Sequence, residues 1–147
     1  MRLSIRKPAA DGLKAMYALE SSIGAGPVPR TTLDLIRLRV SQINGCAFCV
    51  DMHAREAAEA GVSDQRLHAL AAWRDAPFYS EAERAALALA EAATRIPDNP
   101  AGVPDDVWEA AAAHYDEESL AVLVMAIAAI NAWNRINVTV QNAPTAA

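Results

Sequence analysis

Residues 38–53 read Leu-Arg-Val-Ser-Gln-Ile-Asn-Gly-Cys-Ala-Phe-Cys-Val-Asp-Met-His. Apolar residues at helical spacing before the Asn-Gly pair predict a helix, and the glycine interrupts it. A new helix is expected to begin at about Cys46 and to run to Ala60, with Gly61 ending it. The stretch therefore predicts two helices joined by a short turn, with two cysteines near the start of the second.

The rest of the chain also has helical patterns separated by short breaks. Ser63 is a candidate N-cap, and Ser80 with Glu83 forms a capping box. The other predicted helices cover about 11–20, 32–43, 64–73, 81–96, 104–115 and 120–136. Helix 120–136 is apolar nearly all round and is expected to be the buried centre or an interface, whereas residues 137–140 have an extended pattern. These patterns predict an all-α fold in one domain, residues 1–147.

Composition excludes several classes of protein. The chain has 147 residues, 53% of them hydrophobic, which is atypical of disorder, and its two cysteines cannot form a disulfide-rich scaffold. A net charge of −5 without a basic run argues against nucleic-acid binding. The longest apolar run, 120–130, is shorter than the roughly 20 residues that span a membrane. No secretory signal is recognised at the start, so we expect a reducing, cytoplasmic compartment.

Cys46, Cys49 and His53 are predicted to share one face of their helix. At about 100° per residue, Cys49 lies about 60° from Cys46, and His53 projects between the two. The array suits thiol redox chemistry, because a base can activate one thiol while the second thiol resolves the oxidised product. Two other interpretations stay open. In the first, the cysteines are simply two small buried hydrophobic residues. In the second, they bind a zinc ion together with His53, and His68 or His114 is the fourth ligand.

The sequence alone gives two answers for the attacking thiol. The partial positive charge of the helix N-terminus favours Cys46. Adjacency to His53 favours Cys49. Because a positioned base is the more specific device, we predict that Cys49 is the nucleophile.

Residues 38–53 resemble the core signature of the alkylhydroperoxidase D (AhpD)-like branch of the carboxymuconolactone decarboxylase family. Residues 130–136 and 78–80 are similar to later segments of that branch. The resemblance implies an all-α AhpD-like helical bundle that assembles as a homotrimer or homohexamer. It also implies an antioxidant peroxidase or disulfide reductase that works without a bound cofactor or metal.

The resemblance also implies individual roles. Cys49 reacts with the peroxide, and Cys46 resolves the product to a disulfide. His53 belongs to a proton relay with a glutamate that lies twelve residues before the first cysteine. Here that position holds Asp34, which is one methylene shorter and which also fits a capping box with Thr31. An external dithiol, such as a lipoyl group or a thioredoxin-like protein, is the expected reductant.

Two other function classes remain as alternatives at this stage. One is a lactone decarboxylase of the same superfamily, which the cysteine pair disfavours. The other is a non-catalytic redox-sensing oligomer. Trp133 and Arg135 fit either the mouth of the pocket or ordinary helix packing.

Overall fold

A computed structural model describes residues 1–145. Within that range the chain forms α-helices and two short 3₁₀-helices, without a β-strand. The helices are α1 (Ala10–Gly24), α2 (Arg30–Asn44), α3 (Ala47–Glu59), α4 (Asp64–Ala69), η1 (Leu70–Ala72), α5 (Glu81–Thr94), η2 (Ile96–Asp98), α6 (Asp105–Ala112) and α7 (Glu117–Val140). The predicted all-α fold is confirmed.

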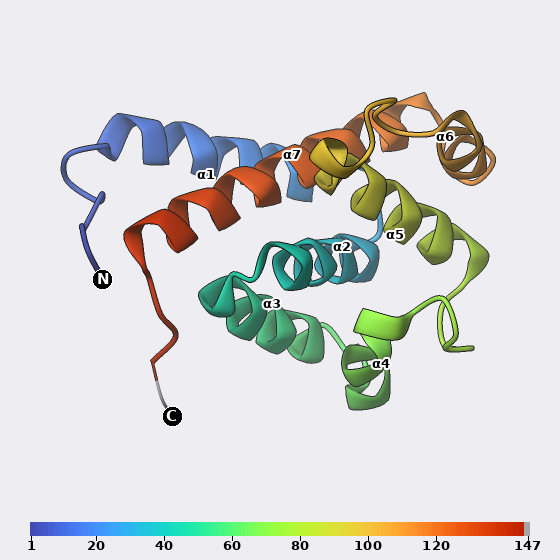
Figure 1. The fold of residues 1–147 in the computed structure, drawn as a ribbon, viewed down its shortest axis with the longest axis horizontal. Helices are drawn as coiled ribbons and strands as arrows, with labels where there is room; N and C mark the ends of the chain where they lie inside the picture. The colour runs from blue at the N-terminus through green and yellow to red at the C-terminus, as the bar shows by residue number, and fades with distance from the viewer. Residues whose placement is uncertain (146–147) are drawn as a thin grey trace.

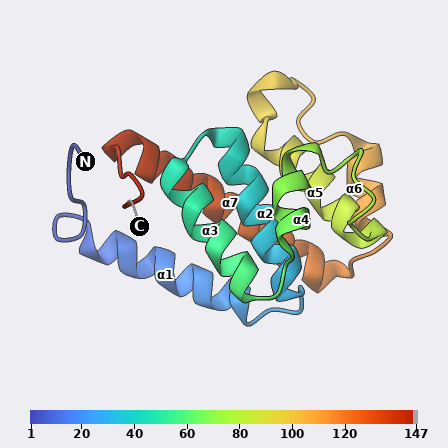
Figure 2. The same cartoon turned by 90° about the horizontal axis from the view of Figure 1, so that it is seen from below.

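Helix α2 is the centre of the bundle. It packs against α3, α5 and α7, and Figures 1 and 2 show it among these three helices. Leu33, Ile36 and Val40 enter one apolar core with α5, α6 and α7. Leu35 and Leu38 enter a second core with α3, η1 and the segment before α5. Because both cores share α2, this helix fixes where its neighbours lie.

Helices α1 and α7 lie side by side along one edge of the bundle (Figure 1). The backbone N–H of Arg2 donates to the Val140 carbonyl at 2.7 Å, so the first residues run beside the end of α7. Figure 2 shows the N-terminus at this side of the molecule, beside the end of α7. The N-terminal segment therefore lies close to α7 and α3.

A tight turn connects α2 to α3. Gly45 ends α2 in the left-handed region at φ 66°, which glycine adopts without the steric cost of a side chain. The N–H of Cys46 then reaches back to the Ser41 carbonyl at 3.1 Å. Cys46 is the N-cap of α3, and its Sγ accepts from the Cys49 N–H at 3.3 Å. The turn thus fixes both cysteines at the start of α3.

An asparagine cluster, formed by Asn131 and Asn134 of α7 with Asn44 of α2, holds this turn against α7. Asn134 is fully buried, and its Nδ2 donates to Ser41 Oγ at 3.1 Å. Asn44 Nδ2 donates to the side-chain oxygens of Asn131 and Asn134, each at 2.9 Å. Buried amides need such partners, so the cluster fixes how α7 sits on α2.

Local signals for the helix ends were largely right. Ser63 caps α4, Ser80 and Glu83 form the predicted capping box, and Gly61 follows the end of α3 with positive φ. The extended segment predicted at 137–140 is wrong, because α7 continues through Val140. Packing of this last turn beside the N-terminal segment overrides the β-propensity of its valines and threonine.

Of the two alternatives for the last helix, the buried centre is corrected, and the interface stays a prediction. Helix α7 buries one face against α1, α2 and α5 and leaves Val124 and Met125 44% and 45% exposed. By length and composition alone, the helix Glu117–Val140 is long and apolar enough to cross a membrane. The uninterrupted apolar run in its sequence, residues 120–130, is shorter than such a span needs. In this structure one of its faces packs against other helices of the bundle, α1, α2, α3, α5 and α6.

We expect Asn134→Ala to lower the free energy of unfolding by about 2 kcal/mol, because it leaves the buried Ser41 hydroxyl without its donor. Urea denaturation followed by circular dichroism measures the loss. Gln65→Ala is the control, since this side chain is exposed on α4, outside the asparagine cluster. Equal losses in the two variants would contradict the role given to the asparagine cluster.

Candidate active site

The two cysteines form a disulfide in this structure. Their Cα atoms are 5.3 Å apart, a spacing that the pair reaches without moving the backbone. Both side chains are buried, yet they differ in what they face. Cys49 lines a cavity of about 630 Å³, and Cys46 is not among its lining residues. Cys49 is therefore the sulfur that a molecule in this cavity meets.

The cavity lies between α1, α3, α7 and the N-terminal segment. Its apolar and aromatic walls come from all four, including Ile5, Tyr17, Phe48, Met52, Trp133 and Ile136. The rings of Tyr17 and Trp133 are in contact, with centroids 5.4 Å apart. Such walls with a few polar groups are typical of a site for a small organic molecule.

His53 lies one turn after Cys49 on α3 and lines the same cavity. The residue is 7% exposed, and its Nδ1 is 2.9 Å from Glu56 Oε2. Burial lowers the pKa of His53, and the hydrogen bond to Glu56 only partly offsets this effect. The lowered pKa favours the neutral imidazole at pH 7. A proton on Nδ1 that bonds to Glu56 leaves Nε2 as a proton acceptor.

A chain of ionic contacts runs behind this histidine. Arg37 of α2 bonds to Glu20 of α1 at 2.8 Å and lies 3.5 Å from Asp34. Glu20 also accepts from the indole N–H of Trp133 at 3.1 Å. Both Glu20 and Arg37 line the cavity. These contacts tie α1, α2 and α7 together at one wall of the site.

Asp34 is placed differently from the other predicted residues. It is fully buried and bonds to Arg30 at 3.0 Å, and it is not among the residues that line the cavity. The carboxylate that contacts His53 is Glu56. The capping interpretation of Asp34 is wrong, because α2 begins at Arg30 and has Pro29 as its N-cap. Thr31 therefore lies inside the helix, and Asp34 neutralises two arginines.

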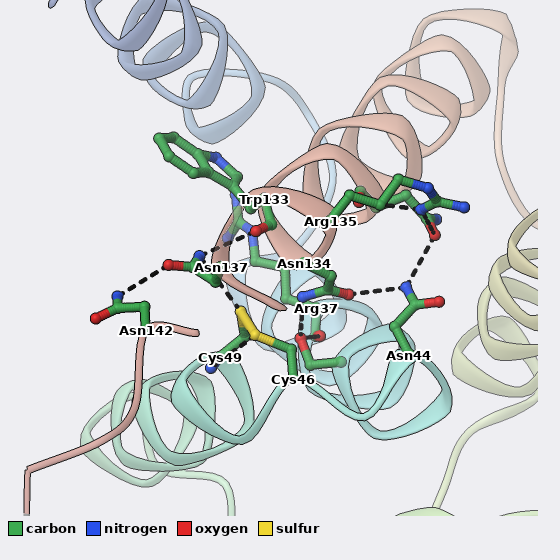
Figure 3. The surroundings of a disulfide bond; sticks show 11 residues. Arg37, Asn44, Cys46, Cys49, Trp133, Asn134, Arg135, Asn137 and Asn142 are labelled. Atoms are coloured by element: carbon green, nitrogen blue, oxygen red, sulfur yellow. Dashed lines mark hydrogen bonds between the residues drawn. A yellow bond between two sulfur atoms is a disulfide. The ribbon is translucent and has the colours of Figure 1, made fainter. Parts of the chain in front are cut away.

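Sequence reasoning missed several polar residues of the cavity, among them Glu56, Glu20 and Asn137. Glu56 had a local signal, since a carboxylate three residues after His53 lies on the same helix surface. Glu20 and Asn137 had none, because they come from α1 and α7. Figure 3 shows Asn137 beside the Cys49 sulfur, where its Nδ2 is 3.7 Å from Sγ.

Of the other residues singled out in the sequence, one lines the cavity and the others lie outside it. Trp133 lines the cavity, whereas Arg135 is exposed and bonds to Asn131 outside it. His68 and His114 are exposed. Among residues 1–145, no group of three or more His, Cys, Asp and Glu side chains is arranged to hold a metal ion.

The chain is similar in sequence to several known proteins. The sequence pattern described as the carboxymuconolactone decarboxylase family matches residues 10–92. The uncharacterised protein YdfG of Bacillus subtilis is 44% identical over 141 residues, which cover 96% of this chain and 95% of YdfG. Alkyl hydroperoxide reductase AhpD of Methylocella silvestris is 46% identical over 43 residues, 29% of this chain and 24% of that protein.

Two solved structures are also similar. One is a protein of unknown function from Agrobacterium tumefaciens, provisionally assigned to antioxidant defence as AhpD, with a TM-score of 0.92, 39% identity and 99% of each chain covered. The other is the debrominase Bmp8, with a TM-score of 0.81, 26% identity, and 95% of this chain and 74% of Bmp8 covered. The likeness to AhpD-like proteins confirms the resemblance seen in the sequence.

The lowered pKa of His53 predicts a pH-dependent stability. Between this folded-state pKa and the ordinary value of 6.5, the unfolded chain binds more protons than the folded chain. Stability is therefore full above about pH 6.5 and falls as the pH drops through that window. We expect His53→Gln to flatten this part of the curve, measured by urea denaturation at a series of pH values.

His68→Gln is the matched control, because it removes an exposed histidine and should keep the wild-type slope. A wild-type slope in His53→Gln as well would show that burial of this imidazole does not govern the pH dependence.

Proposed function

The chain belongs to the carboxymuconolactone decarboxylase family as an AhpD-like member, and from its site we propose that it is a thiol-dependent peroxidase. One observation carries the proposal: Cys49 faces an organic-sized cavity that His53 also lines, and it is bonded to Cys46. This arrangement provides a nucleophile, a base and a resolving thiol on one short helix. That members of this family are enzymes agrees with it.

In the first step, neutral His53 takes the proton of the Cys49 thiol. The thiolate attacks the distal oxygen of a hydroperoxide; a sulfur–oxygen bond forms and the oxygen–oxygen bond breaks. The leaving alkoxide recovers the proton from His53 and departs as an alcohol. Cys49 is left as a sulfenic acid, oxidised by two electrons.

In the second step, the Cys46 thiol attacks the sulfur of the Cys49 sulfenic acid and releases water. The product is the Cys46–Cys49 disulfide, the form that this structure holds. Cys46 suits the role, because its Sγ already accepts the Cys49 N–H at the N-terminus of α3, where negative charge is stabilised.

The catalytic cycle then needs an external reductant. A dithiol donor, such as a lipoyl group or a thioredoxin-like protein, reduces the disulfide by thiol–disulfide exchange and becomes oxidised itself. The proposal requires no bound cofactor or metal. It places the protein in the reducing cytoplasm as a homotrimer or homohexamer, and the exposed Val124 and Met125 side chains supply apolar surface for such an assembly.

Reductive dehalogenation is a second candidate. The specific observation is the likeness to the debrominase Bmp8, together with the aromatic walls formed here by Tyr17, Phe48 and Trp133. The same dithiol supplies the two electrons that replace a carbon–halogen bond by a carbon–hydrogen bond. Bromide release from a brominated pyrrole in the presence of a dithiol would identify this activity.

We predict that the protein consumes cumene hydroperoxide when dihydrolipoamide or a reduced thioredoxin is supplied. Cys49→Ser should abolish turnover, because it removes the attacking sulfur, and Cys46→Ser should prevent disulfide formation. His53→Gln should lower kcat/KM roughly 100-fold or more, since general-base help is worth that much. Coupled oxidation of NADPH through the reductase of the donor measures each rate.

His68→Gln serves as the control and should match the wild type. Failure of the wild type to consume peroxide with any dithiol donor would refute the peroxidase. Stoichiometric oxidation of the two thiols without turnover would favour the redox-sensing alternative.

A further inference from the structure

Cys49 has a side-chain partner that the mechanism above does not use. The Nδ2 of Asn137 lies 3.7 Å from Cys49 Sγ, within hydrogen-bonding range for a sulfur acceptor. Asn137 is in the last turn of α7, whereas Cys49 is in the first turn of α3. Its amide is thus the group that α7 presents to the sulfur facing the cavity (Figure 3).

Hydrogen bonds at both ends of the amide set its orientation. Asn137 Oδ1 accepts from Asn142 Nδ2 at 2.9 Å. Nδ2 donates one hydrogen to the Trp133 carbonyl, also at 2.9 Å. An amide nitrogen carries two hydrogens, so the second is available for Cys49. A flipped amide would set Oδ1 against the Trp133 carbonyl oxygen; a donor, not an acceptor, therefore faces the sulfur.

The two polar neighbours of the reacting sulfur have separate tasks. His53 is bonded to Glu56 and acts as the base that takes the Cys49 proton, and the Glu56 carboxylate offsets the positive charge that the imidazole then acquires. The Cys49 side chain is 1% exposed, and burial disfavours a thiolate that lacks a partner. A fixed N–H donor favours the charged form, as does any hydrogen bond made to an anion.

We propose that Asn137 is a catalytic residue that donates its second amide hydrogen to Cys49 and stabilises the thiolate. The proposal deepens the proposed function and rests on it for the reaction, although the ionisation of Cys49 is measurable without peroxide. In this arrangement α3 supplies the nucleophile and the base, and α7 supplies the group that compensates the charge. The charge leaves the sulfur with the electron pair that forms the sulfur–oxygen bond.

The proposal has a characteristic kinetic consequence. A tenfold loss of thiolate lowers the rate tenfold, but the less stabilised thiolate regains roughly threefold in nucleophilicity, because the Brønsted coefficient is about 0.4–0.5. Removal of the donor should therefore slow the reaction near neutral pH and leave it equal or faster at alkaline pH. A merely structural defect would lower the rate at every pH.

The test uses full-length protein with Cys46→Ser, so that Cys49 is the single thiol, and measures the rate of alkylation by iodoacetamide from pH 5 to pH 11. In this background Asn137→Leu should move the midpoint of the profile upward by ~1 pH unit, the tenfold change expected for a hydrogen bond to an anion. Asn137→Asp keeps the shape, adds a like charge and should shift it at least as far. In both variants the alkylation rate at the alkaline plateau should equal or exceed that of the Cys46→Ser parent.

Three further variants keep the proposal falsifiable. Asn137→Gln retains an amide and should lie between the parent and Asn137→Leu. Asn142→Ala removes only the partner of Oδ1 and should shift the midpoint less than Asn137→Leu. Arg135→Ala is exposed on the same helix and should have the parent profile. Melting temperatures identify any variant that fails to fold, and Asn137→Asp, nearly isosteric, then carries the test.

Unchanged midpoints in folded Asn137→Leu and Asn137→Asp would overturn the proposal. A shift in Asn142→Ala as large as that in Asn137→Leu would also overturn it, since the ordering of the end of α7 would then determine the ionisation of Cys49. If the midpoints shift but the wild type reduces no peroxide, the proposed peroxidase function is refuted, whereas the role of Asn137 in the ionisation of Cys49 is supported.

Discussion

The hydrogen bonds between α7 and the α2–α3 turn hold the site together. Asn134 is fully buried and reaches Ser41, the residue whose carbonyl receives the Cys46 N–H. This turn sets where α3 begins, and α3 carries both cysteines and His53. The same helix α7 brings Trp133 and Asn137 to the cavity. The buried Asn134 and its asparagine neighbours thus fix the distance between the nucleophile and the walls around it.

The helices and most of their ends were predictable because their signals are local. A capping box at Ser80 and a glycine at 61 act within a few residues, and tertiary packing agrees with them. The errors arose where packing decides. Residues 137–140 are helical beside the N-terminal segment, and α2, which contains Asp34 and Arg37, is the buried centre instead of the more apolar α7. Ion pairs make that burial possible, and they are invisible in a hydrophobic pattern.

The residues of the candidate site also fall into a group that local sequence signals predict and a group that only tertiary packing brings together. Cys46, Cys49 and His53 lie within eight residues, and helical spacing brings Cys49 and His53 to one cavity, whereas Cys46 is the N-cap before the helix and is joined to Cys49 by the disulfide. Glu20 and Asn137 reach the cavity from α1 and α7, and no spacing rule connects them to the cysteines. The structure also separates the two thiols, since Cys49 lines the cavity and Cys46 caps the helix beside it. That asymmetry supports the proposal that Cys49, beside the base, is the nucleophile.

The central claim is that the Cys49 sulfur is the atom that meets the substrate. The most direct test treats the Cys46→Ser and Cys49→Ser proteins with one equivalent of cumene hydroperoxide in the presence of dimedone and maps the adduct by mass spectrometry. The account predicts a dimedone adduct on Cys49 in the Cys46→Ser protein. An adduct on Cys46 in the Cys49→Ser protein, with none on Cys49 in the other variant, would contradict it.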